Sequence, residues 1–447
     1  MKQKIIILGA AESGIGAALL AQQQGFAVWV SDGGVIKNKY KQQLISNNIE
    51  HEQGVHTLQK FVGATYIIKS PGIPSNAPII KQLKSEGYCI ISEIEFAAKY
   101  VGNSTIIAIT GSNGKTTTTT MVHHMLSLAG LNVVMCGNIG NSFAAQIVLQ
   151  PADVYVVEVS SFQLDDIKDF KPHIAILTNI TPDHLDRYEY DINKYAAAKF
   201  NITKNQTVDD IFIFCADDVV TQQQLPLHPT LAQLYPFSLN KVLPQGAYIN
   251  NNETMIVKVK DESMEMNVSD FTLKGKHNQY NGMAAAVSSL YMGIRKESVR
   301  DSLKSIESIA HRIETVATIR GVEYINDSKG TNVNSTWYAL ECINKPIILI
   351  LGGVDKGNDY SVLNDLVAKK VKAIICLGLN NEPLHIAFGT IVPTIMDTAS
   401  AKEAVGLAYS LSTNGDAVLL SPSCASFDLF DNFEDRGIQF KKAVLAL

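Results

Sequence analysis

The chain has 447 residues, of which 46% are apolar and 18% are charged, and its formal net charge is −5. At roughly 150 residues per domain, this length predicts about three domains, each able to bury its own core. The composition is that of a folded soluble enzyme and excludes a disordered chain, and the mildly acidic balance argues against nucleic-acid binding. Six scattered cysteines, none in a CxxC pair, indicate reduced thiols and no structural zinc motif.

The chain begins with a short apolar run, residues 5–8, that reaches the turn at Gly9 too early for a signal peptide. No later apolar stretch is long enough to cross a bilayer. We therefore expect a cytoplasmic protein without membrane insertion, and we expect it to act as a monomer.

Strand and helix patterns alternate along the chain in three successive series, which predicts parallel sheets flanked by helices. In the first series, residues 4–8 and 26–30 are predicted strands, and residues 14–24 form the helix between them. The connecting turn, residues 9–14, resembles a dinucleotide-binding loop with Ala11 at the middle glycine, and Asp32 ends the next strand. Small residues in this turn would also let the helix pack closely on the strand, so an NAD-dependent dehydrogenase and a purely structural turn both stay open.

A second series begins after residue 95 with a predicted buried strand over residues 105–110 that leads into a glycine-rich loop and a helix. Glycines let backbone N–H groups approach phosphate, a lysine reaches the terminal phosphates and a threonine hydroxyl can ligate Mg²⁺. The loop is shorter than the common GxxxxGK[ST] pattern, because Ile109 stands where that pattern has its first glycine. The order of strand, loop and helix predicts ATP binding by Gly111, Ser112, Asn113, Gly114, Lys115, Thr116 and Thr117.

Polar residues that could hold a metal ion follow the next predicted strands. Residues 154–159 carry Glu158, and residues 174–179 lead to a polar loop that contains His184. Each could by itself be a structural residue, but together with Lys115 they favour a phosphoryl-transfer site with Mg²⁺. Lys199 lies on an alanine-rich helix, where a buried ammonium would be costly unless the side chain reaches the surface.

Four segments, residues 110–117, 158–164, 179–186 and 198–199, closely resemble the Mur ligases of peptidoglycan synthesis, with folylpolyglutamate synthases as more distant relatives. The resemblance implies a three-domain α/β fold. Its parts would be a Rossmann-like UDP-substrate domain over residues 1–95, a central P-loop ATPase domain with a mainly parallel sheet over 96–308, and a Rossmann-like amino-acid-binding domain over 309–447.

The resemblance also implies that CO₂ carbamylates Lys199, which would turn a cation into a metal-binding anion. Two Mg²⁺ ions would follow, one near Thr116 and Glu158 and the other near His184 and the carbamate on Lys199. Whether His184 accepts a proton or serves only as a metal ligand stays open.

The C-terminal third carries motifs at residues 311–312, 326–332, 352–357 and 421–426 that resemble the branch adding D-glutamate to UDP-N-acetylmuramoyl-L-alanine. For that reaction the resemblance implies catalytic roles for Lys115, His184, Lys199 and Lys329. Beyond the glycine-rich loop, it implies nucleotide contacts by Asn278, Asn281, Arg312 and Asp327. It implies substrate contacts by Ser13, Asp32, Gly72, Asn138, Gln163, Thr331, Lys356, Ser426 and Phe433.

The implied mechanism solves a problem of reactivity, since a carboxylate is a poor acyl donor. Transfer of the γ-phosphoryl group of ATP gives an acyl phosphate, which the amine of D-glutamate attacks, and the C-terminal domain would close over the central one to exclude water. Three alternatives stay open: a sister ligase that adds L-alanine or a diamino acid, the dehydrogenase, and a nucleotide-binding module without turnover.

Overall fold

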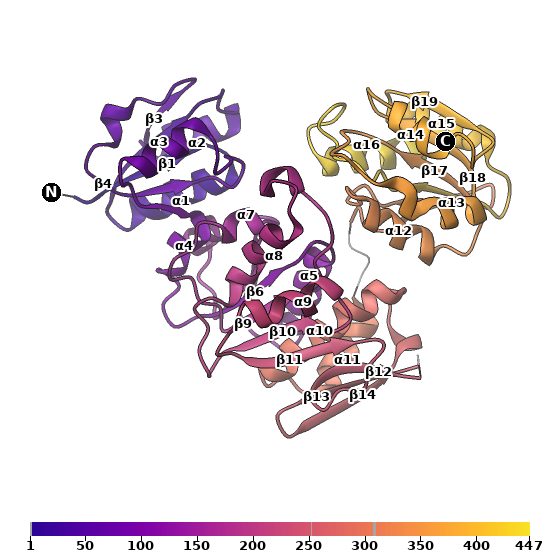
Figure 1. Ribbon diagram of the computed structural model, residues 1–447, viewed down its shortest axis with the longest axis horizontal. Helices are drawn as coiled ribbons and strands as arrows, with labels where there is room; N and C mark the ends of the chain where they lie inside the picture. The colour runs from indigo at the N-terminus through magenta and orange to yellow at the C-terminus, as the bar shows by residue number, and fades with distance from the viewer. Residues whose placement is uncertain (1, 252, 307–309) are drawn as a thin grey trace. The chain divides into compact units, whose positions relative to one another are not determined.

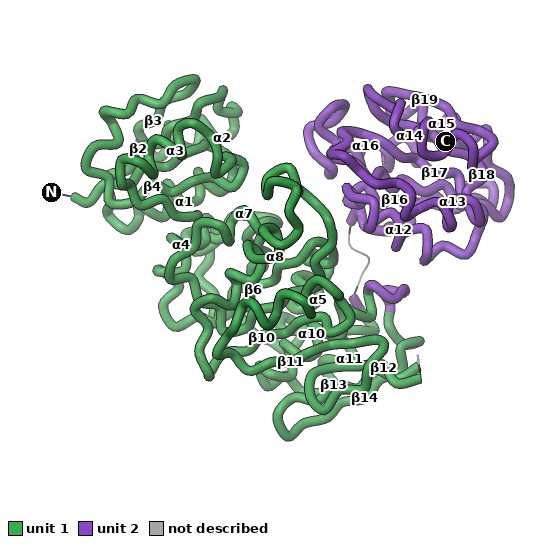
Figure 2. The backbone as a smooth tube through the Cα atoms, in the orientation of Figure 1, with its two compact units in different colours: residues 1–271, 278–305 green, residues 272–277, 306–447 purple. Residues whose placement is uncertain are grey.

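A computed structural model describes residues 2–251, 253–306 and 310–447, which form two compact units. Figure 2 colours unit 1, residues 1–271 with 278–305, in green and unit 2, residues 272–277 with 306–447, in purple. We describe each unit by itself. The predicted domain limit at residues 308 and 309 lies outside the described residues, and the limit at residue 95 stays a prediction.

Unit 1 begins with a five-stranded parallel sheet in the order β3-β2-β1-β4-β5. Its strands are β1 Lys4–Leu8, β2 Ala27–Asp32, β3 Glu50–Gln53, β4 Ala64–Lys69 and β5 Ile90–Ser92, and its helices are α1 Glu12–Gln23, α2 Asn38–Ser46, α3 Pro78–Ser85 and α4 Glu93–Ala98. Because side chains alternate along a strand, Ile5 and Ile7 pack with α1 whereas Ile6 and Leu8 pack with α3. Both faces are therefore buried, as the apolar run in the sequence predicts.

A nine-stranded sheet follows in the order β14-β13-β12-β11-β10-β9-β6-β8-β7, parallel from β7 to β12 and antiparallel beyond. The strands are β6 Thr105–Thr110, β7 Val133–Gly137, β8 Val154–Glu158, β9 Ile174–Leu177, β10 Ile211–Cys215, β11 Gln233–Ser238, β12 Gly246–Asn250, β13 Thr254–Val259 and β14 Glu262–Asn267. The helices are α5 Lys115–Leu128, α6 Phe143–Leu149, α7 Ser161–Leu164, α8 Ile192–Phe200, α9 Val219–Gln224, α10 Lys276–Tyr291 and α11 Lys296–Ser305. The strands β7, β8, β6, β9 and β10 are mutually parallel, so all of them end at one edge of the sheet; Figure 1 labels β6, β9 and β10 among them.

The two sheets of unit 1 share one apolar cluster, because α1 and α4 of the first sheet pack against α6 of the second. Glu95 on α4 adds polar anchors, since its carboxylate accepts the backbone N–H groups of residues 168, 169 and 170 at 2.8–3.0 Å. A second link is the buried ion pair between Lys69 and Asp166, at 2.9 Å. These contacts hold the first sheet firmly to the second within unit 1.

Unit 2 contains a six-stranded sheet in the order β15-β16-β20-β17-β18-β19, in which only the β15–β16 pair is antiparallel. The strands are β15 Glu314–Ile319, β16 Val322–Asn326, β17 Ile347–Leu351, β18 Val371–Leu377, β19 Ile395–Thr398 and β20 Ala417–Leu420, and the helices are α12 Val333–Cys342, α13 Asn364–Lys370, α14 Glu382–Phe388, α15 Ala401–Leu411 and α16 Phe433–Leu445. Separate apolar clusters cover the two faces, one under α12 to α14 and the other under α15 and α16. Among the described residues, no helix is both long and apolar enough to cross a membrane.

The crossing of α1 over α6 predicts a strict size limit at Gly16. A Cβ atom there would lie 2.1 Å from Ser142 Oγ and 2.8 Å from the backbone nitrogen of Ala145, whereas one at Gly406, also inside a helix, meets nothing within 4 Å. We expect Gly16→Ala to destabilise unit 1 by about 1–3 kcal/mol through overpacking. Gly406→Ala, the matched control, should be neutral or stabilising by up to about 1 kcal/mol, because alanine favours a helix. Thermal unfolding measures both, and equal midpoints for the two variants would contradict the proposed contact.

Candidate active site

The loop between β6 and α5 needs glycine at two positions. Gly111 has a φ of +146° and Gly114 a φ of +83°, a range that side chains disfavour. A Cβ at Gly111 would also lie 1.9 Å from Thr178 Oγ1, and one at Gly114 would lie 2.4 Å from Asn281 Oδ1. The loop can therefore pack closely against Thr178 and Asn281 and lead directly into α5. The N-terminus of that helix carries partial positive charge and favours a bound anion.

The segment after β9 holds this loop in place. Ser112 and Asn113 donate their backbone N–H groups to the carbonyl and side-chain oxygens of Asn179 at 2.8 and 2.9 Å. In return, Thr178 Oγ1 donates to the carbonyl oxygen of Asn113 at 2.6 Å. Asn179 lies in a motif that the sequence singled out, but its role as the support of the loop is visible only in the structure.

Lys115 and Lys199 meet at one acceptor. The ammonium of Lys115 donates to the carbonyl oxygens of Gly111 and Ser112 at 2.8 and 2.9 Å, and that of Lys199 donates to the same Gly111 oxygen at 2.8 Å. Lys199 also lies 4.4 Å above the ring centre of Tyr195. Lys199 is 1% exposed, so its interpretation as a lysine that reaches the surface is wrong.

Burial lowers the pKa of the Lys199 ammonium well below its usual value, and the positive charge of Lys115 lowers it further. The carboxylates of Asp183 and Asp165 partly oppose this shift. Burial raises the pKa of Asp165 itself to about 6, although the Tyr188 hydroxyl donates to this carboxylate at 3.1 Å. These two aspartates were absent from the predicted site, although Asp183 lies inside the motif that contains His184.

A hydroxyl and a carboxylate lie side by side at the start of α5. Thr116 Oγ1 donates to Glu158 Oε2 at 2.7 Å, and both residues are buried. Asn138 Nδ2 donates to the other oxygen, Glu158 Oε1, at 2.9 Å. A hydroxyl and a carboxylate are ligands that Mg²⁺ prefers, so this pair could hold that ion beside the phosphate loop. Asn138, predicted to bind substrate, orients the carboxylate in this structure.

His184 begins the 3-10 turn Leu185–Tyr188 with a left-handed backbone, at a φ of +54°. Its Nε2 lies 3.7 Å from Asp183 Oδ1, and its ring packs edge-on against Phe162. Gln163, on α7, accepts the backbone N–H of Ser160 through its side-chain oxygen at 2.9 Å, which closes a capping box. In this conformation the Gln163 amide oxygen caps its own helix.

Asn278 and Asn281 share one face of α10, as their spacing predicts. Asn281 Nδ2 donates to Asn278 Oδ1 at 3.4 Å, and Asn281 Oδ1 accepts the hydroxyl of Thr118 on α5 at 3.3 Å. The structure therefore brings this pair against the helix that begins at the phosphate loop.

The predicted nucleotide-sugar residues lie at the carboxyl edge of the first sheet. Asp32 accepts the backbone N–H groups of Ala10 and Gly34 at 2.7 and 2.8 Å, which ties the turn after β1 to the end of β2. Ser13 lies on α1, and Gly72 follows β4. β1 and β4 are neighbours at the point where the strand order reverses, where ligands of such sheets bind.

The remaining predicted residues belong to unit 2. Asp327, after β16, accepts the hydroxyl of Ser421 at 2.7 Å, and burial raises its pKa to about 6 although the charge of Arg312 opposes this shift. Arg312 Nε is buried and makes no hydrogen bond within the described residues. Burial and Arg312 together lower the pKa of His277 to about 4. A buried guanidinium nitrogen without a partner is a favourable position for an anionic ligand.

Lys329 lies 5.0 Å above the ring centre of Phe433, and its carbonyl oxygen accepts the N–H of Thr331 at 2.9 Å. Ser426 is buried, whereas Lys356 is exposed in the loop after β17. The site residues thus form separate groups in unit 1 and unit 2.

Three family models match successive parts of the chain. They are the Mur ligase MurD-like N-terminal domain over residues 3–92, the Mur ligase middle domain over 109–289 and the Mur ligase glutamate ligase domain over 311–424.

Relatives of similar length match from end to end. The chain is 53% identical to a protein of Christiangramia forsetii over 444 residues, which cover 99% of each chain. It is 49% identical to a protein of Bacteroides thetaiotaomicron over 446 residues, with 100% of each chain covered. Both relatives are named UDP-N-acetylmuramoylalanine--D-glutamate ligase.

Solved structures agree in fold. The UDP-N-acetylmuramate-alanine ligase of Thermotoga maritima superposes with a TM-score of 0.64 at 17% identity, covering 99% of each chain. A pseudomurein peptide ligase type C from Methanothermus fervidus gives a TM-score of 0.63 at 19% identity, covering 100% of this chain and 99% of that one. The expected three-domain α/β fold is confirmed. Family models match all three parts of the chain, and a relative that is covered to 99% is 53% identical to it. This chain therefore belongs to the Mur ligase family.

Proposed function

We propose that this chain is an ATP-dependent ligase that joins D-glutamate to the carboxylate of UDP-N-acetylmuramoyl-L-alanine in peptidoglycan precursor synthesis. The two relatives named UDP-N-acetylmuramoylalanine--D-glutamate ligase match over 99% and 100% of this chain. The observation that carries the proposal is the buried Thr116–Glu158 pair at the start of α5, the helix that follows the loop whose Gly111 carbonyl accepts two lysines. Such a group suits phosphoryl transfer and has no use in hydride transfer. The enzyme would act as a monomer in the cytoplasm.

Nucleotide binding would centre on the phosphate loop, residues 111–117. Phosphate oxygens would replace the two loop carbonyls as partners of the Lys115 ammonium, and the N-terminus of α5 would favour their charge. Asn278 and Asn281 would contact the nucleotide beside the same helix. In unit 2, Arg312 would turn its buried Nε toward ATP, with Asp327 as its acidic neighbour.

Two Mg²⁺ sites fit the residues present. Thr116 and Glu158 would hold the first ion, and their hydrogen bond already places hydroxyl and carboxylate together. His184 and a carbamate on Lys199 would hold the second, near Asp183. Bound Mg²⁺ would neutralise charge that develops on the transferred phosphoryl group and the reacting carboxylate.

The surroundings of Lys199 favour carbamylation. Only an uncharged amine adds CO₂, and the lowered pKa of Lys199 increases the uncharged fraction near neutral pH. The positive charge of Lys115, which disfavours a second ammonium, would stabilise an anionic carbamate at the same place. The fully buried side chain would then carry a metal ligand instead of an uncompensated cation.

Substrate positions follow the carboxyl edges of the sheets. Ser13, Asp32 and Gly72 would receive the UDP group, and Asn138 and Gln163 would lie near the muramoyl-alanine part. Thr331, Lys356, Ser426 and Phe433 would hold D-glutamate, whose second carboxylate suits the Lys356 ammonium. Lys115 would stabilise the charge on the phosphoryl group during formation of the acyl phosphate, and Lys329 would approach as unit 2 closes over the nucleotide.

The first test is phosphate release from ATP with UDP-N-acetylmuramoyl-L-alanine and one amino acid at a time. We expect release with D-glutamate and background release with L-glutamate, L-alanine or no amino acid. Release with another amino acid would assign the chain to a sister ligase. No release under any condition would instead support a nucleotide-binding module without turnover.

The Thr116–Glu158 pair predicts a specific dependence on one hydroxyl. Thr116→Val keeps the shape of the side chain but removes a Mg²⁺ ligand, so we expect kcat to fall by at least about 100-fold. The matched control is Thr119→Val on the same helix, because Thr119 is also buried and its hydroxyl donates to the backbone carbonyl of Lys115 at 2.9 Å. Steady-state kinetics at several Mg²⁺ concentrations measure both variants. An equal loss in both would show that packing, not metal binding, explains the effect.

The low pKa of Lys199 predicts a carbamate that can be observed without an activity assay. With ¹³C-labelled bicarbonate, NMR should detect one protein carbamate signal that grows as pH rises, since the uncharged amine fraction increases. Lys199→Arg should abolish the signal and lower kcat by about 100-fold or more. Lys194→Arg, at an exposed position on the same helix, should retain both. A signal that persists in the Lys199 variant would contradict the assignment.

A further inference from the structure

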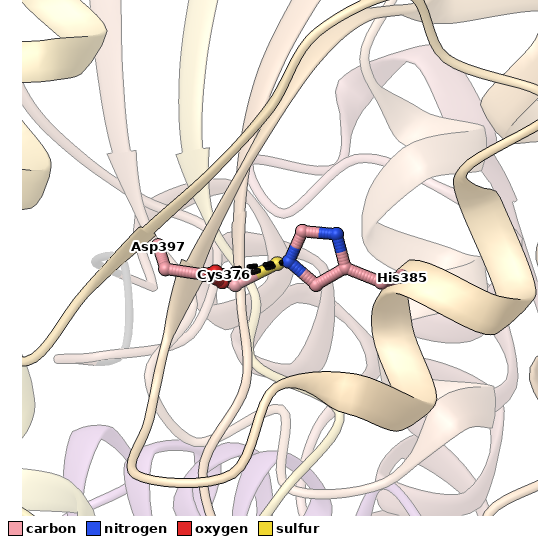
Figure 3. A group of neighbouring side chains, drawn as sticks. All are labelled: Cys376, His385 and Asp397. Atoms are coloured by element: carbon pink, nitrogen blue, oxygen red, sulfur yellow. Dashed lines mark hydrogen bonds and ion pairs between the residues drawn. The ribbon is translucent and has the colours of Figure 1, made fainter.

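Three potential metal ligands meet at the far edge of the unit 2 sheet. Cys376 lies near the end of β18, Asp397 lies on the edge strand β19, and His385 lies on α14. One ligand atom from each residue lies within 4.8 Å of the other two. The imidazole Nε2 of His385 is 3.0 Å from both carboxylate oxygens of Asp397, and Figure 3 shows the three side chains pointing toward one another.

The fold brings these residues together through strand register. Cys376 and Asp397 are directly paired on parallel strands, so their side chains leave the same face of the sheet. On that face Cys376 joins the apolar cluster that includes Leu384 and Phe388 of α14. His385, on the same helix, is thereby held above the edge of the sheet. The Cys376 thiol is buried beneath the other two side chains, whereas those of His385 and Asp397 are 42% and 55% exposed.

The ligand chemistry selects a class of metal. A thiolate and an imidazole favour zinc and similar transition ions, whereas Mg²⁺ prefers oxygen ligands alone. We propose that Cys376, His385 and Asp397 bind one divalent transition-metal ion of the zinc type. Binding breaks the S–H bond of Cys376, forms a metal–sulfur bond and releases the proton to solvent. No electron transfer or further reactant is required.

Three protein ligands leave one tetrahedral position open. His385 and Asp397 line an open surface cavity of about 600 Å³, whose wall also includes Gly378, Asn381 and Thr398. Water or a small ligand can therefore reach the fourth position. The ion would also join β18, β19 and α14, so it would stabilise this edge of the sheet.

A nucleophilic cysteine triad explains the geometry less well. In such a triad the thiol and the acid contact opposite nitrogens of the imidazole. Here the sulfur and the Asp397 carboxylate lie on the same side of the His385 ring (Figure 3). Convergence of all three groups on one point is the arrangement of a metal site.

The site lies apart from the residues proposed for ATP in unit 2. Asp327 follows β16, and two strands, β20 and β17, separate β16 from β18. Metal binding is measured by absorption and needs no ligase turnover, so a failure of this proposal is distinct from a failure of the proposed function.

The test is titration of the full-length, metal-free protein with Co²⁺, followed by absorption spectroscopy in the presence of excess Mg²⁺. We expect one equivalent to bind, with the intense thiolate-to-cobalt charge-transfer band and the visible bands of a tetrahedral ion. His385→Asn and Asp397→Asn are exposed changes that should fold normally and weaken binding by roughly 100-fold or more. Cys376→Ala should abolish the charge-transfer band, and Zn²⁺ should displace Co²⁺.

Cys342→Ser is the matched control, because Cys342 is another unit 2 thiol near an imidazole, with its sulfur 3.6 Å from His277 Nδ1. This variant should bind Co²⁺ as the unaltered chain does. As a second readout, Zn²⁺ should raise the thermal midpoint of unit 2 in the unaltered chain and in Cys342→Ser, but not in His385→Asn. A charge-transfer band that is absent from the unaltered chain, that survives in Cys376→Ala or that disappears in Cys342→Ser would overturn the proposal.

Discussion

Two ammonium groups share the carbonyl oxygen of Gly111, and the site in unit 1 depends on that arrangement. The left-handed region at Gly111 and Gly114 lets the loop lie against the segment after β9, which turns the Gly111 carbonyl toward both Lys115 and Lys199. Burial is the main cause that lowers the pKa of Lys199, and the positive charge of Lys115 at the same acceptor lowers it further. An anion, either phosphate beside Lys115 or carbamate on Lys199, would relieve this repulsion. Electrostatics therefore connects the proposed ATP site to the proposed metal site.

The carboxylates around these lysines divide into two kinds. Glu158 accepts from two neutral donors, the hydroxyl of Thr116 and the amide of Asn138, which orient its two oxygens before any ion binds. Asp165 and Asp183 instead act at longer range on Lys199, and burial keeps the pKa of Asp165 near 6. An oriented carboxylate suits a direct metal ligand, whereas the other two adjust the charge of the cavity.

Unit 2 repeats the same architectural rule with different chemistry. Parallel strands end at one edge, and the segments after β16, β17 and β20 carry most of the proposed ATP and amino-acid residues. Arg312 leaves a buried nitrogen unpartnered within the described residues, which is costly without a ligand. The far edge of the sheet, at β18 and β19, instead gathers a thiol, an imidazole and a carboxylate. The sheet thus carries two chemically different groups of residues, one after its central strands and one at the lateral strands β18 and β19.

The sequence by itself determined the series of strands and helices and the phosphate loop after β6. It also placed Glu158 near a strand end and Lys199 near a helix end. These features depend on hydrophobic periodicity and glycine positions, which neighbouring residues in the chain define. The sequence could not decide whether Lys199 is buried, which backbone oxygen it meets or that Asn138 orients Glu158, since those facts depend on residues 20 to 88 positions apart in the chain. The cysteines looked unremarkable for metal binding because no CxxC pair is present. Only the register of β18 with β19 placed Cys376 beside Asp397 and under His385, since strand pairing is set by tertiary packing.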